Sequence, residues 1–210
     1  MRSVTMEEEK IAVEKVKNGD SGAFELLVIA CQNDVYAVAL KMLGNAEDAL
    51  DASQDAFIKA YTGISKFRGD AKFSVWMYRI TYNICLDKLR KTKRQPVVTI
   101  ERDEDEPEMQ IADASPTPEE RLINRENVKL VRQGLDRLSP KLRSVLILRE
   151  VSGLSYTEIS SATGLREGTV KSRINRARAS LAEFIRENGT FDEAKRHSSI
   201  KDVKGGGNNA

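Results

Sequence analysis

The sequence predicts an all-α protein in which two helical domains are joined by a flexible acidic linker. Apolar residues recur at steps of three and four through residues 7–95, which is the pattern of packed helices. A proline-punctuated acidic stretch follows at residues 96–118, and a second helical region fills residues 119–187. Residues 188–210 end in Gly and Asn and are expected to form a mobile tail. No segment has a convincing period of two, so no strand is predicted.

The composition is that of a soluble globular protein. The 210 residues include 34 Lys and Arg against 32 Asp and Glu, and 40% are hydrophobic, which leaves room for one or two domains. The N-terminus is acidic, and we expect no apolar run to approach the roughly 20 residues that span a bilayer, so a cytoplasmic protein is predicted. Cys31 and Cys85 lie far apart without CxxC spacing, so neither a metal site nor a disulfide framework is predicted.

Three helices are expected in the first domain from Phe24 onward. One long helix carries a single apolar stripe; its members are Phe24, Leu27, Cys31, Val35, Val38 and Met42. The sequence GNAED then breaks the chain, and a helix over residues 47–64 is expected to bury Leu50, Phe57 and Ile64. A third helix over residues 72–91 is expected to bury Phe73, Met77, Ile80 and Ile84.

The helix over residues 72–91 is unusual on the faces away from its core. Tyr78 and Tyr82 lie one turn apart, and a further stripe holds Trp76, Arg79, Asn83 and Arg90. Aromatic rings beside cations suit unstacked bases, because rings stack on bases and cations follow the phosphate backbone. For Trp76 alone, packing against neighbouring helices is the favoured interpretation, but the whole set favours a nucleic-acid surface.

The second domain contains a helix-turn-helix signature at residues 153–181. The domain begins with a helix over residues 119–138, and the next helix is expected to start at Ser139 and Pro140, which are typical of a helix start. Ser155 and Glu158 form a capping box, and Gly164 lies where the turn between two helices needs a left-handed residue. The following helix is expected to bury Val170, Ile174, Ala177 and Leu181.

The opposite side of that last helix suits the major groove of DNA. It presents Thr169, Ser172, Asn175 and Arg176, with Lys171, Arg173 and Arg178 on its flanks. Asn and Arg make bidentate contacts to base edges, and flanking cations meet phosphates. A solvated basic face is the plainer alternative. A single module buries only about 600 to 1,000 Å² on DNA, and no dimerisation helix is evident, so a further source of affinity is expected.

Two blocks of sequence resemble the signature domains of extracytoplasmic-function (group 4) sigma factors of the sigma-70 family. They read KFRGDAKFSVWMYRITYNICLDKLRK and LSPKLRSVLILREVSGLSYTEISSATGLREGTVKSRINRARASL. The resemblance implies a subunit that lets core RNA polymerase find and open promoters. It implies a region 2-like domain at 7–95, a variable linker, and a region 4-like domain at 119–187.

The resemblance also implies three sets of site residues. DASQDAFIKAY resembles the segment that binds the clamp helices of the polymerase β′ subunit. The motif can start at Asp48 or, three residues later, at Asp51, and the candidate polymerase-binding residues are Asp48, Asp51, Gln54 and Asp55. The loop at 66–72 and the helix after it resemble the part that captures an extruded base of the minus-10 element; the candidates are Lys66, Phe67, Arg68, Asp70, Lys72, Trp76, Arg79, Asn83 and Arg90. The minus-35 element would be read as duplex by Arg166, Thr169, Lys171, Ser172, Arg173, Asn175, Arg176 and Arg178.

The implied partners are core RNA polymerase, through its β′ and β subunits, promoter DNA and a cognate anti-sigma factor. The free protein is expected to be a monomer, held in some conditions at the inner face of the membrane by that factor. No cofactor, metal or small-molecule substrate is implied. Fully extended, the linker would span about 75 to 80 Å. Its acidic residues, Glu101, Asp103, Glu104, Asp105 and Glu106, suggest a place in the basic channel that RNA later occupies.

Two other classes of function are weaker. A stand-alone helix-turn-helix regulator would bind duplex without polymerase, and would leave the Trp76 to Asn83 surface and the acidic linker unexplained. An enzyme is disfavoured, because no nucleophile with a base and no glycine-rich phosphate loop is visible. The acidic run at 103–106 lacks the rigid scaffold that Mg²⁺-dependent nuclease chemistry needs.

Overall fold

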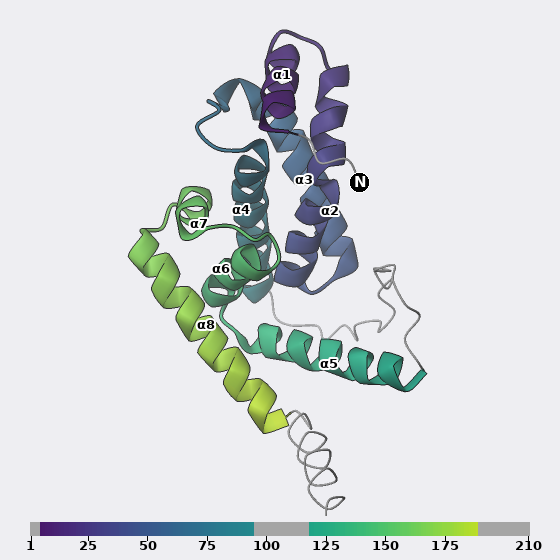
Figure 1. Cartoon of the computed structure of the whole chain (residues 1–210), viewed down its shortest axis with the longest axis vertical. Coiled ribbons are helices and arrows are strands. Elements are labelled where there is room, and N and C mark those ends of the chain that lie inside the picture. Colours follow the sequence, from purple (N-terminus) through teal and green to yellow (C-terminus); the bar gives the residue numbers. More distant parts are fainter. Residues whose placement is uncertain (1–4, 95–117, 189–210) are drawn as a thin grey trace, which may run out of the picture.

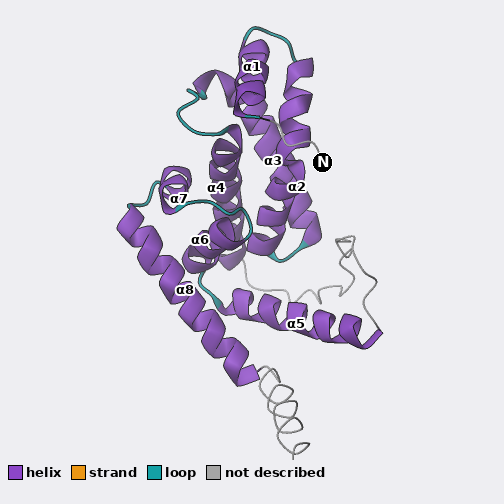
Figure 2. Ribbon diagram, viewed as in Figure 1, coloured by secondary structure: helices purple, strands orange, loops and turns teal. Residues whose placement is uncertain are grey.

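The computed structural model describes residues 5–94 and 118–188, and in these ranges every regular element is a helix (Figure 2). The elements are α1 (Met6–Lys17), α2 (Gly22–Leu43), α3 (Ala46–Gly63), the 3-10 turn η1 (Ile64–Lys66), α4 (Phe73–Arg94), α5 (Pro118–Arg137), α6 (Pro140–Glu150), α7 (Tyr156–Thr163) and α8 (Glu167–Asn188). The all-α prediction is confirmed. The acidic residues expected in the linker, and the tail beyond residue 188, lie outside the described residues.

The N-terminal lobe, α1–α4, is built around α2, which lies against α1, α3 and α4. The stripe predicted for this helix forms its buried side: Leu27, Val35, Val38 and Met42 are at most 1% exposed. Gly44, in the left-handed conformation at φ 72°, ends α2, and Asn45 caps α3 by accepting a hydrogen bond from the Asp48 N–H at 3.0 Å. Local sequence signals thus set the α2–α3 corner.

α2 is more apolar than we expected from the sequence. An 18-residue window in it has a mean hydropathy of 1.5, so by length and composition it could cross a membrane. The expectation that no apolar run reaches this length is therefore wrong. The core helix of a soluble protein passes the same test, and α2 is surrounded by α1, α3, α4 and α6.

The C-terminal lobe, α5–α8, holds the helix-turn-helix. α8 packs against α5, α6 and α7, and Figure 1 shows it running diagonally across the lobe. Ile159, Val170, Ile174 and Ala177 are fully buried between these helices, as their spacing predicts.

The two lobes are in direct contact. α7 lies along α4, and α6 lies against α2 and α4 (Figure 1). Most of the buried apolar side chains form one cluster that extends from Ala12 in α1 to Ile174 in α8, and Leu138, Leu146 and Ala177 form a second, smaller one. Two arginines of the C-terminal lobe reach the end of α2: Arg143 Nη1 donates to the Met42 carbonyl at 3.2 Å, and Arg132 Nη2 donates to the Gly44 carbonyl at 2.9 Å.

A few residues predicted to be buried are not. Leu50 is 51% exposed, because it lies on the side of α3 that faces away from α2 and α4. Phe57, Ile80 and Leu181 are half-buried at the edges of the core. The remaining predicted core residues of α3 and α4, Ile64, Phe73, Met77 and Ile84, are buried.

Candidate protein and nucleic-acid interfaces

The outer face of α3 combines acidic and apolar side chains. Its predicted members Asp48, Asp51, Gln54 and Asp55 are all exposed. Between and beyond them lie Leu50, Ile58 and Tyr61, which are 51%, 61% and 45% exposed. Exposed apolar side chains beside carboxylates are typical of a protein-binding surface. The sequence did not show that Leu50, Ile58 and Tyr61 are exposed, because apolar residues on a protein-binding face have the same helical spacing as apolar residues in a core.

Lys88 of α4 links this face to the neighbouring helix. Its Nζ lies 3.5 Å from Asp48 Oδ1 and 3.6 Å from Asp51 Oδ2. The two carboxylates are more than half exposed, so these ion pairs are weak and leave both available to a partner. Asp48 and Asp51 therefore occupy one surface, whichever of them begins the motif.

An aromatic cluster supports the loop at residues 66–72. The Phe67 ring lies 5.2 Å from that of Trp76 and 5.8 Å from that of Phe73, and the Phe73 and Trp76 rings lie 5.7 Å apart. Phe67 is only 8% exposed, so its ring holds the loop from beneath. The polar members Lys66, Arg68, Asp70 and Lys72 are exposed. The packing interpretation of Trp76 agrees with this arrangement.

α4 presents two different faces outside the core of its lobe. Arg79, Asn83 and Arg90 are exposed, as a nucleic-acid surface requires. Tyr78 and Tyr82 are 4% and 6% exposed, and in this arrangement the interpretation of the tyrosines as a base-stacking surface is wrong. Burial, with a smaller contribution from Asp34, raises the pKa of Tyr78 to about 12. The sequence could not show this, because α7, which lies along α4, begins 74 residues after Tyr82.

The helix-turn-helix is set by local hydrogen bonds. Ser155 Oγ accepts from the Glu158 N–H at 3.2 Å, and Glu158 Oε2 accepts from the Ser155 N–H at 2.8 Å. The pKa of Glu158 is lowered first by the bond that its carboxylate accepts from the Ser155 N–H, and second by the bond that it accepts from the Ser155 hydroxyl at 2.7 Å. Gly164 ends α7 at φ 72°, where a side chain would be strained. Both predicted signals are present.

α8 presents a basic, amide-bearing face to solvent. Arg166, just before α8, and Lys171, Asn175, Arg176 and Arg178 within it are exposed, while Thr169, Ser172 and Arg173 are half-buried. Arg178 Nη2 lies 2.5 Å from Glu150 Oε1, and this contact raises the pKa of Arg178. Arg178 is thus held by α6, whereas Asn175 and Arg176 project at the centre of the face. The geometry fits a helix that enters a major groove.

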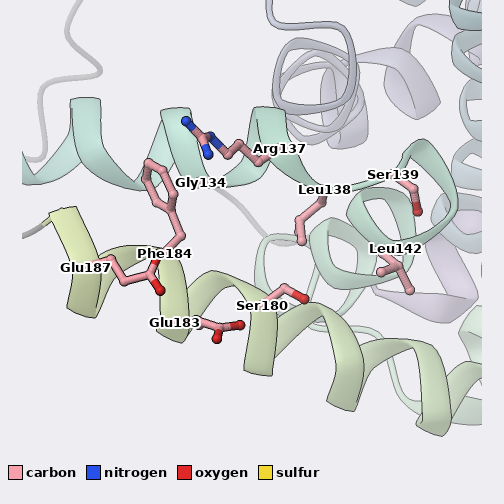
Figure 3. A pocket seen from close by; sticks show the side chains of 9 residues that line it. All are labelled: Gly134, Arg137, Leu138, Ser139, Leu142, Ser180, Glu183, Phe184 and Glu187. Carbon is pink, nitrogen blue, oxygen red and sulfur yellow. The ribbon is translucent and has the colours of Figure 1, made fainter.

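A groove between α5 and α8 was not predicted from the sequence. It has a volume of about 250 Å³. Figure 3 shows Leu138, Leu142 and Phe184 as its apolar lining and Glu183 and Glu187 on α8. The Arg137 guanidinium lies 5.2 Å from the centre of the Phe184 ring. Gly134 permits the helices to approach, because a Cβ there would lie 2.5 Å from Leu181 Cδ1 and 2.9 Å from Phe184 Cδ1.

Comparison with known families finds two matches in the same order as the lobes. Residues 27–95 match Sigma-70 region 2, and residues 129–181 match Sigma-70, region 4. The RNA polymerase sigma-H factor of Pseudomonas aeruginosa is 36% identical over 186 residues, which cover 87% of this chain and 96% of that protein. The ECF RNA polymerase sigma factor SigW of Bacillus subtilis is 34% identical over 181 residues, which cover 85% and 97%.

The fold has solved counterparts. CnrH, in its complex with the cytosolic domain of CnrY, matches with a TM-score of 0.65 at 23% identity, over 87% of this chain and 99% of that one. RpoE of Bartonella quintana, in complex with the anti-sigma factor NepR, matches with a TM-score of 0.63 at 23% identity, over 79% of this chain and 98% of that one. These likenesses support the helical architecture.

Proposed function

Because this chain belongs to the extracytoplasmic-function sigma factors of the sigma-70 family, which direct RNA polymerase to promoters, we propose how its surfaces divide that work. The observation that carries the proposal is the presence in one chain of three separate exposed faces, on α3, on α4 with the loop before it, and on α8. Each has the side chains that one step of initiation needs. In this proposal the factor contributes recognition.

The outer face of α3 would bind core polymerase through the clamp helices of the β′ subunit. Its exposed carboxylates give charge complementarity and a fast on-rate to a basic partner. Its exposed apolar residues, Leu50 and Ile58, give buried contact area that carboxylates alone do not. This combination explains why large apolar side chains remain in solvent in the free protein.

The loop at 66–72 and the exposed face of α4 would read the minus-10 element as melted single strand. Extruding a base costs a few kcal/mol of unstacking, so a pocket that compensates only for the right base turns melting into sequence selection. Arg79 and Arg90 would follow the phosphate backbone, and Asn83 would offer an amide to a base edge. The buried ring cluster beneath the loop supplies the rigidity that such a pocket needs.

α8 would read the minus-35 element as duplex, with Asn175 and Arg176 at base edges and Lys171 and Arg173 toward phosphates. The groove between α5 and α8 is a suitable site for the polymerase β subunit, because an apolar floor with a charged rim is typical of a protein interface. Binding there would place α8 on the enzyme as well as on the promoter.

Simultaneous contact with both promoter elements requires the lobes to separate. The elements are named for positions about 25 base pairs apart, which is about 85 Å at about 3.4 Å per base pair. In the structure α7 instead lies against α4. We propose that polymerase and promoter hold an open arrangement, in which the lobes themselves and a linker that reaches about 75 to 80 Å at full extension together cover this distance. A tethered second contact then forms at high effective concentration.

An anti-sigma factor would hold the factor inactive in the cytoplasm until a signal releases it. The support is by analogy: the solved RpoE chain is in complex with an anti-sigma factor. The exposed α3 face and the apolar groove between α5 and α8 are the surfaces such a protein would compete for.

The test is complex formation with bacterial core RNA polymerase, measured by size-exclusion chromatography with multi-angle light scattering. A one-to-one complex is expected for the natural chain, and the double reversal Asp51→Lys with Asp55→Lys should weaken it at least tenfold. The matched control, Glu25→Lys with Glu126→Lys, makes the same charge change at exposed sites on α2 and α5. No complex with an active core enzyme, together with tight duplex binding by the protein alone, would favour the stand-alone regulator.

A further inference from the structure

α4 begins without a cap of its own. The N-cap positions of α1, α3 and α7 hold Thr5, Asn45 and Ser155, whose side chains each accept a backbone N–H. The residue before α4 is Lys72, and an ammonium group accepts no hydrogen bond. Its carbonyl accepts the N–H groups of Val75 and Trp76, at 3.1 and 3.2 Å. The N–H groups of the first two helical residues, Phe73 and Ser74, have no acceptor within the helix, and that of Phe73 is satisfied from elsewhere in the chain.

Glu9 of α1 supplies the missing acceptor from 64 residues away. Its Oε2 accepts the Phe73 N–H at 3.2 Å in a partly buried position. A carboxylate at a helix N-terminus also complements the positive end of the helix dipole. α1 lies against η1, so the same helix supports the chain on both sides of the loop at 66–72.

The loop is therefore anchored at each end. At its start the Phe67 ring is buried against Phe73 and Trp76. At its end the Phe73 backbone is bound to Glu9. Between the anchors the loop residues Arg68, Gly69 and Asp70 are exposed, and Gly69 adopts φ 79°. A short loop keeps a defined shape only when both ends are fixed, so a change at either anchor should alter the shape that a captured base meets.

We propose that Glu9 is a positioning residue for minus-10 base capture: through its bond to the Phe73 N–H it holds the base-contacting loop at 66–72 in register. This inference rests on the proposed function of that loop. It assigns to α1, which lies outside the Sigma-70 region 2 match at 27–95, a role in promoter selectivity that is separate from its role in packing.

The test is a selection that needs no known promoter. Holoenzyme, reconstituted from the full chain and core RNA polymerase, is presented with fork-junction DNA that is randomised in the minus-35 duplex and in the single-stranded minus-10 segment. Bound DNA is sequenced, and the preference at each position is read as the enrichment of its best base over the others. Glu9→Ala, Glu9→Gln and Glu7→Ala are compared with the natural chain, since Glu7 is an exposed carboxylate of the same helix.

Glu9→Ala should lower the preference at the captured minus-10 base about fivefold, which corresponds to roughly 1 kcal/mol at 1.36 kcal/mol per tenfold change and is typical of a lost cap. Glu9→Gln keeps an oxygen acceptor and should restore most of that preference. Glu7→Ala and the preferences at minus-35 positions should remain unchanged.

An unchanged minus-10 preference in Glu9→Ala, with the natural chain enriching both elements, would overturn the inference alone. An equal loss at minus-10 and minus-35 positions, with a lowered Tm that Glu9→Gln does not restore, would also overturn it, because it would indicate loss of folding. No enrichment by the natural chain would instead count against the proposed function.

Discussion

The two regions that we propose to read DNA are built in different ways. The α7–α8 unit takes its shape from neighbouring residues: Ser155 and Glu158 cap α7, Gly164 makes the turn, and the residues proposed to contact DNA follow on α8. The α4 region also depends on distant segments, because the Phe73 ring packs against Phe24 of α2 and the Phe73 N–H is bound to Glu9 of α1. The surface proposed to read duplex thus rests on a locally encoded unit, whereas the surface proposed to read single strand rests on tertiary contacts.

The largest effects should come from truncation in the shared core. Ile159→Ala in α7 and Met77→Ala in α4 each remove a side chain that is 0% exposed, and each should lower the free energy of unfolding by about 2 to 5 kcal/mol. Chemical denaturation followed by circular dichroism measures this. Val151→Ala, at a 39% exposed site, is the control and should stay within about 0.5 kcal/mol. A small loss at either buried site would contradict the continuous core.

The next largest effect is expected at the contact between the N-terminal and C-terminal lobes. Arg143 is 8% exposed and binds the Met42 carbonyl and Asp136 Oδ1, so Arg143→Ala should weaken the closed arrangement by about 1.5 to 3 kcal/mol, the range for hydrogen bonds of charged groups. Energy transfer between dyes on Lys10→Cys and Ala182→Cys should fall. Burial chiefly raises the pKa of the Cys31 and Cys85 thiols to about 12, so the introduced thiols react selectively near neutral pH.

Lys141→Ala is the matched control for that measurement, because Lys141 is an exposed cation on the same helix. It should leave the energy transfer unchanged. Equal transfer in Arg143→Ala and in the natural chain would show that the arginine does not hold the lobes together.

The sequence predicted what is locally encoded. The α2 stripe, the Ser155 capping box, the Gly164 turn and the burial of Val170, Ile174 and Ala177 on α8 follow from spacing and residue type. The predictions for Leu50, Tyr78 and Tyr82 were wrong. Helical spacing distinguishes an apolar face from a polar one, but it does not show whether an apolar residue such as Leu50 lies in the core or on a protein-binding surface. It also does not show whether a face such as that of Tyr78 and Tyr82 is exposed to solvent or covered by a second lobe. Glu9 gave no signal at all, since nothing in a chain marks a carboxylate that caps a helix 64 residues away.

Duplex reading can be tested at a single side chain. Arg176 is exposed at the centre of the α8 face, and Arg176→Ala should reduce discrimination at one minus-35 base pair by about 1 to 3 kcal/mol. Sequencing of selected duplexes bound by holoenzyme measures the preference at each position. Arg186→Ala, an exposed cation in the last turn of the same helix, should change no position. A uniform loss at all positions would assign Arg176 to phosphate contact instead.

The smallest expected effect is that of removing the capping box of Ser155 and Glu158 at the start of α7. Ser155→Ala should lower stability by about 1 kcal/mol, measured by thermal unfolding, and Ser161→Ala, at an exposed site on α7, should not. The pKa of Glu158 is lower in the folded chain than in the unfolded chain. The carboxylate therefore stabilises the fold fully above the ordinary glutamate pKa of about 4.3, and this stabilisation is lost as the pH falls through the pKa of the folded chain. The stability difference between the natural chain and Glu158→Gln should therefore be constant from pH 7 to about 5 and shrink below about pH 4. A difference that persists undiminished at lower pH would show that the carboxylate charge does not contribute, and that side-chain packing rather than the capping box determines where α7 begins.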